Sequence, residues 1–171
     1  MHGNYESIIS GDPRMAARTL AGSPSLHLRH SSGSVTKEAL WEKIVTHDAT
    51  NELMFLLTPG SSDTQVNSCG LVQNHAYTVL SGVTLSNGIR LVQVRNPWGS
   101  ERYNCDWSDS SNLWTLQLKN EVISKTENYE GRVNDGVFFM QLEDYYAQGL
   151  ATQISFDTDG WYQDHFLMLG D

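Results

Sequence analysis

The chain of 171 residues is long enough to form one globular domain with its own core. Its 20 acidic and 11 basic residues give a formal charge of −9, which repels nucleic acid and anionic membranes and argues against both as partners. No apolar run approaches the roughly 18 residues of a membrane-spanning helix, so we expect no transmembrane segment.

The first third of the chain predicts few regular elements. Residues 1–34 carry turn signals and little periodicity, and we expect an irregular N-terminal segment there. Apolar residues at helical spacing predict a helix over residues 36–48. The short apolar run 52–58 is typical of a buried strand, and the polar residues 59–68 are typical of a loop.

The strongest local signal is a β-hairpin. Residues 75–80 and 89–95 are rich in strand-forming side chains, and between them lies the pair Asn87 and Gly88, which is typical of a tight turn. The remaining elements follow the hairpin: we expect a structured loop at 98–115, helices at 116–125 and 141–148, and strands at 135–140 and 151–156. Together they predict an α+β fold, a mostly antiparallel sheet with a few flanking helices.

His75 opens the first strand of this hairpin and Asn96 follows the second. In an antiparallel pair, the numbers of two directly opposed residues have a constant sum. This sum is 175 when the turn is centred on Asn87 and Gly88, whereas the numbers of His75 and Asn96 add to 171. The two are therefore expected four ladder positions out of register, or fewer if the strands contain a bulge. Both lie at the same end of the hairpin, where their side chains can meet.

A His–Asn pair has a chemical use. The amide oxygen of Asn96 can fix the tautomer of the His75 imidazole, so that the other ring nitrogen accepts a proton from a nucleophile. The indole of Trp98, two residues further on, can shield that contact from water. The same residues also fit a histidine of the core and an asparagine of a turn, so the pattern alone leaves both interpretations open.

Cys69 and Cys105 are the only cysteines of the chain. Two thiols do not make a disulfide framework, and they are too far apart in sequence for a CxxC zinc motif. We expect both to be structural thiols in a reducing, intracellular environment, and we predict a cytoplasmic location.

Two segments resemble the calpain family of cysteine proteases. They are GLVQNHAYTV at 70–79 and VRNPWG at 94–99, in the order in which calpains carry their catalytic histidine and asparagine. Weaker likeness is found downstream in DWSD at 106–109 and DGVFFM at 135–140, and upstream in NYESIISG at 4–11. The resemblance covers roughly residues 4–156.

The resemblance implies a papain-like fold, the second subdomain of a calpain core, over residues 35–160. Residues 1–34 would precede it as its irregular N-terminal segment, and residues 161–171 would form a C-terminal extension or the start of a linker. The resemblance also implies that His75 is the general base, that Asn96 orients it and that Trp98 shields the site.

The chain departs from the family at the nucleophile. Calpains carry a catalytic cysteine in a D-C-W segment of the preceding subdomain, and no segment here matches it. The resemblance therefore implies a cysteine endopeptidase that hydrolyses protein substrates through an acyl-enzyme only when a first subdomain supplies the cysteine. We expect the chain alone to be inactive.

Two further departures concern the site's surroundings. Asn74 stands before His75 where many calpains have glycine, and it is expected to line the substrate cleft. Asp109 and Asp135 match two calcium ligands of the family, but Arg102 and Val137 stand where calpains have glutamates. Calcium prefers many charged oxygen ligands, so we expect these degenerate loops to bind it poorly or not at all, and no cofactor is required.

Two other functions remain possible at this stage. A calpain-like module could bind or regulate other proteins without catalysis, keeping His75 and Asn96 only for packing. An unrelated β-rich domain could instead bind carbohydrate on a platform formed by Trp98, Trp107 and Trp114.

Overall fold

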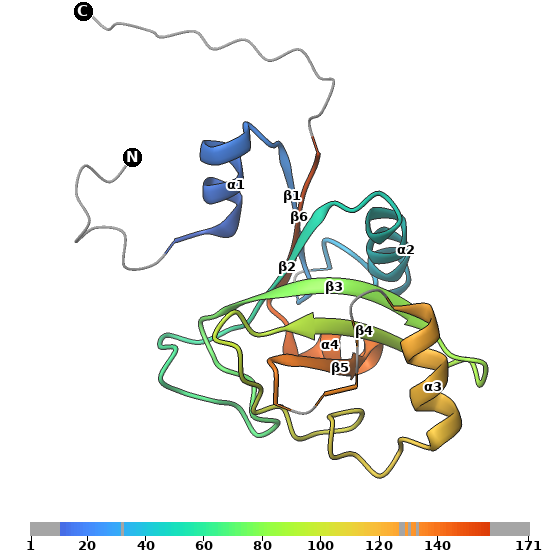
Figure 1. The fold of residues 1–171 in the computed structure, drawn as a ribbon. Helices are drawn as coiled ribbons and strands as arrows, with labels where there is room; N and C mark the ends of the chain where they lie inside the picture. Colours follow the sequence, from blue (N-terminus) through green and yellow to red (C-terminus); the bar gives the residue numbers. More distant parts are fainter. Residues whose placement is uncertain (1–10, 32, 127–128, 130, 133, 158–171) are drawn as a thin grey trace, which may run out of the picture.

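The fold is built on one antiparallel sheet of six strands (Figure 1). In this computed structural model the described residues are 11–31, 33–126, 129, 131–132 and 134–157. The strand order is β1-β6-β2-β3-β4-β5, and every neighbouring pair is antiparallel. The strands are β1 (Ser25–Arg29), β2 (Leu53–Leu57), β3 (Ala76–Thr84), β4 (Arg90–Arg95), β5 (Val137–Gln141) and β6 (Ala151–Ser155).

In the part of the chain that the structure describes, four helices accompany the sheet: α1 (Pro13–Ala21), α2 (Lys37–Asp48), α3 (Leu116–Lys125) and α4 (Leu142–Gln148). The hydroxyls of Thr36 and Thr115 cap α2 and α3, since each accepts a hydrogen bond from the third following amide. The predicted α+β fold is confirmed, and so are the helices expected after residue 35.

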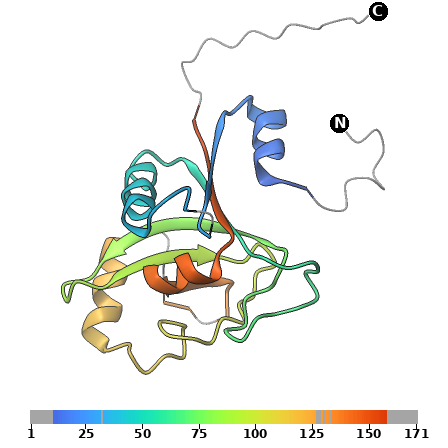
Figure 2. The ribbon, with the colours of Figure 1, turned by 180° about the vertical axis from the view of Figure 1, so that it is seen from behind.

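The two faces of the sheet carry separate hydrophobic clusters. Leu40 and Ile44 of α2 and Tyr145 of α4 belong to the larger one. Val122 of α3 packs on the opposite face with Phe139 of β5. Comparison of Figures 1 and 2 shows the same division, because α4 covers the face that Figure 2 turns toward the reader, and α3 lies beyond the sheet.

A β-bulge in β3 changes which face its side chains cover. The pairing with β4 shifts between Val79 and Ser81, which leaves Leu80 without an opposed residue. Before the bulge, Tyr77 and Val79 point into the larger cluster. After it, Val83 points into the smaller one, although strict alternation would place it on the side of Val79. One strand thereby supplies apolar side chains to both faces.

The prediction of an irregular segment over residues 1–34 is wrong for its described part. Asp12 caps α1 ahead of Pro13, and Gly22 ends that helix in the left-handed region at φ 68°. β1 then pairs with β6 at the edge of the sheet. These elements are short, and β1 is stabilised by a strand more than 100 residues away, which local periodicity does not reveal. Residues 4–10 and 161–171 lie outside the described residues.

Within the described part of the chain, no helix is both long and apolar enough to cross a membrane.

His30 is a buried histidine beside the last strand. Only 2% of its surface is exposed, its Nε2 lies 2.9 Å from the hydroxyl of Thr152, and its ring stacks on Tyr146 at 5.2 Å between centroids. Burial disfavours the charged imidazolium and lowers the pKa of His30 to about 4.

This burial makes the fold sensitive to acid. His30 is neutral in the folded chain but takes up a proton near pH 6.5 once unfolded, so its contribution to stability is complete above pH 6.5 and is lost as the pH falls toward 4. The expected loss is on the order of 3 kcal/mol. Urea unfolding across this range measures it, and in His30→Phe the acid-dependent loss should be smaller by that amount. An unchanged pH profile in the variant contradicts the assignment.

Candidate active site

His75 and Asn96 meet at the end of the β3–β4 ladder. The imidazole Nε2 of His75 lies 3.0 Å from Oδ1 of Asn96. Near the turn Thr84 opposes Arg90, so the residue numbers of an opposed pair add to 174. Beyond the bulge Thr78 opposes Arg95, and the sum falls to 173. His75 and Asn96 are thus two positions out of register rather than four, which is close enough for a diagonal contact between side chains.

The contacts of Asn96 determine which way its amide points. Its Nδ2 donates to the carbonyl of Ser100 at 2.8 Å, and its Oδ1 accepts from the amide of Trp98 at 3.1 Å. The oxygen therefore faces His75, and Nε2 of the neutral ring must be the donor. The lone pair of the imidazole then lies on Nδ1, which is the nitrogen available to accept a proton.

The backbone around Asn96 is held as tightly as its side chain. The residue is buried, and its amide donates to the carbonyl of Gly136 at 2.8 Å. The amide of Gly136 in turn donates to the carboxylate of Glu101 at 2.6 Å. A Cβ at Gly136 would lie only 2.9 Å from the carbonyl oxygen of Asn96, so glycine is required for this close approach.

Two aromatic rings surround the imidazole of His75. Trp98 lies over it with 4.4 Å between centroids, and 55% of the indole residue is exposed, so it separates the ring from solvent on that side. Tyr77 presents its edge at 4.9 Å and 89° from the buried side. Trp98 lies beside the His75 ring, and its role as a shield of the pair stays a prediction. Tyr77 was not anticipated, although its spacing of two from His75 along a strand is the signal that it shares a side.

Asn74, directly before His75, adopts a left-handed conformation with φ 46°. Its amide donates to the carbonyl of Pro59 at 3.0 Å, and its side chain is exposed. Asparagine tolerates this region better than other residues with a Cβ. Asn74 therefore adopts a backbone conformation that glycine also tolerates readily, and it adds a polar side chain next to His75.

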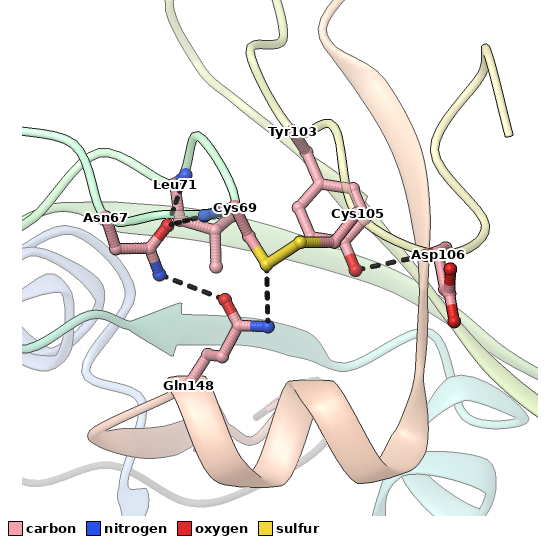
Figure 3. The surroundings of a disulfide bond; sticks show 7 residues. All are labelled: Asn67, Cys69, Leu71, Tyr103, Cys105, Asp106 and Gln148. Carbon is pink, nitrogen blue, oxygen red and sulfur yellow. Dashed lines mark hydrogen bonds between the residues drawn. A yellow bond between two sulfur atoms is a disulfide. The ribbon is translucent and has the colours of Figure 1, made fainter.

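The expectation of two structural thiols is wrong, because Cys69 and Cys105 form a disulfide with 5.1 Å between their Cα atoms (Figure 3). The bond joins the loop that leads into His75 to the loop that leaves Asn96. These loops are distant in sequence, and the hairpin brings them together. The argument for a reducing environment rested on free thiols and no longer applies, so the cytoplasmic location stays a prediction.

Hydrogen bonds surround the disulfide. Oδ1 of Asn67 accepts from the amides of Cys69 and Leu71, and its Nδ2 donates to Gln148 of α4 at 2.9 Å (Figure 3). Gln148 also contacts the sulfur of Cys69 at 3.4 Å. On the other side the amide of Asn104 donates to the carbonyl of Cys69. The two loops are thus held to each other and to α4.

The acidic loops contain a cluster that the sequence revealed only in part. Burial of Asp109 next to the carboxylate of Glu101 raises the pKa of Asp109 to about 7, and Asp135 adds to this negative field. Among the described residues, no group of three or more His, Cys, Asp or Glu side chains is arranged to hold a metal ion. Glu101 is engaged with Gly136, and Val137 is buried at the start of β5. Weak or absent calcium binding at these loops stays a prediction.

The tryptophans do not form a stacking platform for sugars. Trp107 is only 2% exposed and packs edge-on against Trp114 at 4.9 Å, in the cluster that contains Phe139. The carbohydrate-binding hypothesis is therefore wrong, because two of its three rings belong to the hydrophobic packing around α3.

Comparison with known proteins agrees with this geometry. Residues 1–155 match the family described as calpain family cysteine protease. The chain is 34% identical over 150 residues to the calpain-type cysteine protease DEK1 of Arabidopsis thaliana, and 31% identical over 150 residues to human calpain-14. The matched family is one of cysteine proteases, and it spans most of the chain. The chain belongs to the calpain family.

The matches cover 85% of this chain but only 7% of the plant relative and 20% of the human one. The chain therefore spans a small part of the curated relatives that it matches.

We expect the disulfide to stabilise the fold substantially. Closing a loop across a sequence separation of 36 restricts the unfolded chain, and the chain-entropy argument gives about 3 to 4 kcal/mol. The double variant Cys69→Ser and Cys105→Ser should lose this amount in urea unfolding, and the reduced wild-type chain should match it. Peptide mapping of the unreduced chain that shows two unlinked cysteines would contradict the bond.

Proposed function

We propose that this chain is the His/Asn half of a calpain-like cysteine endopeptidase, active on protein substrates when a first core subdomain supplies the cysteine. The observation that carries the proposal is the contact between Nε2 of His75 and Oδ1 of Asn96. The carbonyl of Ser100 fixes the direction of that amide, so Nδ1 is the basic atom.

In this proposal Nδ1 of His75 accepts the thiol proton of the partner's cysteine, which leaves a thiolate beside an imidazolium. The thiolate attacks the peptide carbonyl, and the imidazolium returns its proton to the departing amine. Water, deprotonated by the same nitrogen, then hydrolyses the acyl-enzyme and regenerates the thiol. Asn96 keeps the ring in one orientation throughout, and Trp98 shields their hydrogen bond from water.

The state of the cysteines supports a nucleophile from outside the chain. The chain has only two cysteines, and they are bonded to each other. Neither sulfur can act as a thiolate while that bond is intact. An acyl-enzyme therefore requires a cysteine supplied by a partner subdomain.

We expect no hydrolysis of a casein substrate by the isolated chain, and hydrolysis when it is fused behind a calpain first subdomain. In the fusion, His75→Ala should lower kcat at least ~100-fold, because the general base is lost. Asn96→Ala should lower kcat by about 10- to 100-fold, because the ring loses its orientation. Initial rates over a range of substrate concentrations give both values.

His47→Ala is a matched control for these variants. His47 also contacts an acceptor side chain, Glu52, but it lies on α2, away from His75. Its removal should leave kcat unchanged. Hydrolysis by the isolated chain, or full activity of the fusion carrying His75→Ala, would count against the proposal and in favour of a non-catalytic module.

We also propose that catalysis needs no cofactor and that the acidic loops bind calcium weakly, with Kd no tighter than about 1 mM. Arg102 replaces one carboxylate of the resembling site and Val137 another, so the loops carry less negative charge to hold the cation. Calorimetric titration with calcium should give little heat for the wild type and for Asp109→Ala alike. A micromolar site that disappears in Asp109→Ala would contradict this.

A further inference from the structure

We propose that Thr58 is a positioning residue of the site, and that its hydroxyl holds the backbone of His75 in the place from which the imidazole reaches Asn96. The inference rests on the proposed function of His75. Thr58 directly follows β2, is buried, and belongs to none of the segments that resemble calpains.

The Thr58 hydroxyl makes two complementary contacts. It accepts a hydrogen bond from the amide of His75 at 3.0 Å. Its proton can reach the carbonyl of Val72 at 2.7 Å or that of His75 at 3.1 Å, and Val72 is the nearer acceptor. The backbone amide of Thr58 also donates to the carbonyl of His75 at 3.0 Å. Both main-chain polar groups of His75 are therefore bonded to one residue.

The ladder between β2 and β3 explains why a side chain is needed there. Leu57 pairs with Ala76, so Thr58 is the next residue opposite His75. In a regular antiparallel pair the carbonyl of Thr58 would accept from the His75 amide. Here the chain turns away into Pro59 and Gly60, and the hydroxyl takes the place of that carbonyl. A residue without a hydroxyl would leave the His75 amide without this acceptor.

Val72 links the Thr58 contact to the imidazole ring. Its carbonyl accepts from Thr58, and its amide donates to the phenolic oxygen of Tyr77 at 2.8 Å. The ring of Tyr77 packs edge-on against the ring of His75. The backbone of His75 and one side of its ring are thus fixed through the same buried residue.

The Thr58 hydroxyl is therefore required to keep the backbone of His75 in place. Only 5% of Thr58 and 2% of Val72 are exposed, so loss of the hydroxyl would leave the buried carbonyl of Val72 and the half-buried amide of His75 without these partners. Relief of that unfavourable state requires the segment before His75 to move. A displacement of about 1 Å in a catalytic group can cost about 100-fold in rate, so the rate should respond even where the fold survives.

The test compares Thr58→Val, which removes the hydroxyl at nearly constant volume, with Thr58→Ser, which keeps it. In the isolated chain, hydrogen exchange of the His75 amide should accelerate at least tenfold in Thr58→Val and stay as in wild type in Thr58→Ser. The ring-nitrogen NMR signals should show a single tautomer protonated on Nε2 in wild type and Thr58→Ser, and a mixture in Thr58→Val. In the fusion described above, kcat should fall about tenfold in Thr58→Val with KM unchanged.

Thr126→Val is the matched control. Thr126 is also buried, and its hydroxyl donates to the carbonyl of Val122 at 2.9 Å, beyond the end of α3. This variant should lower the unfolding temperature without changing the exchange of the His75 amide or its tautomer. If Thr58→Val does not fold, Thr58→Ala compared with Thr126→Ala gives the same contrast without the added methyl group.

The proposal is overturned if the folded Thr58 variant without a hydroxyl keeps wild-type exchange and a single tautomer at His75, or if Thr126→Val changes them equally. An inactive wild-type fusion would contradict the proposed function instead, and the exchange and tautomer measurements would still decide the role of Thr58.

Discussion

The antiparallel pairing of β3 with β4, with one extra residue in β3, is the constraint on which the rest of the site depends. The bulge at Leu80 brings His75 and Asn96 within one hydrogen bond of each other. The same bulge turns Val83 toward α3, so one irregularity serves both the site and the packing of the second face. A regular ladder would move the pair further apart and would withdraw an apolar side chain from the smaller cluster.

The loops on either side of this hairpin are joined by covalent and main-chain contacts. The disulfide between Cys69 and Cys105 links the approach to His75 with the exit from Asn96. Gly70 packs so closely on the backbone of Arg102 that a Cβ would lie 1.8 Å from its carbonyl oxygen. Both contacts lie within ten residues of the pair, so the freedom of His75 and Asn96 is limited from the loop side as well as from the strand side.

The sequence predicted the parts of the site that depend on local pattern and on family resemblance, and it missed the parts that depend on distant contacts. The turn signal at Asn87 and Gly88 predicted the position of the hairpin. The order of the two segments that contain His75 and Asn96 predicted that these residues form a pair. The bulge was allowed for but not located, because it is set by the packing of both faces. Thr58 carried no signal, since its role comes from a turn at Pro59 that faces a residue 17 positions later. The cysteines were predicted to be free because there are only two of them, and only the fold shows that their loops meet.

The direction from which a nucleophile can reach His75 follows from what already surrounds the ring. Nε2 is bonded to Asn96, Trp98 lies over one side, and Tyr77 closes the buried side. Under the proposed function, a thiol would therefore approach in the plane of the imidazole, toward Nδ1 and away from Asn96. In the proposed enzyme, the partner's surface would fit around the exposed indole of Trp98 and the exposed Asn74. Under the proposed function the shape of the partner's surface matters before the chemistry, because a cysteine displaced from that plane would meet Trp98 or Tyr77 rather than the basic nitrogen.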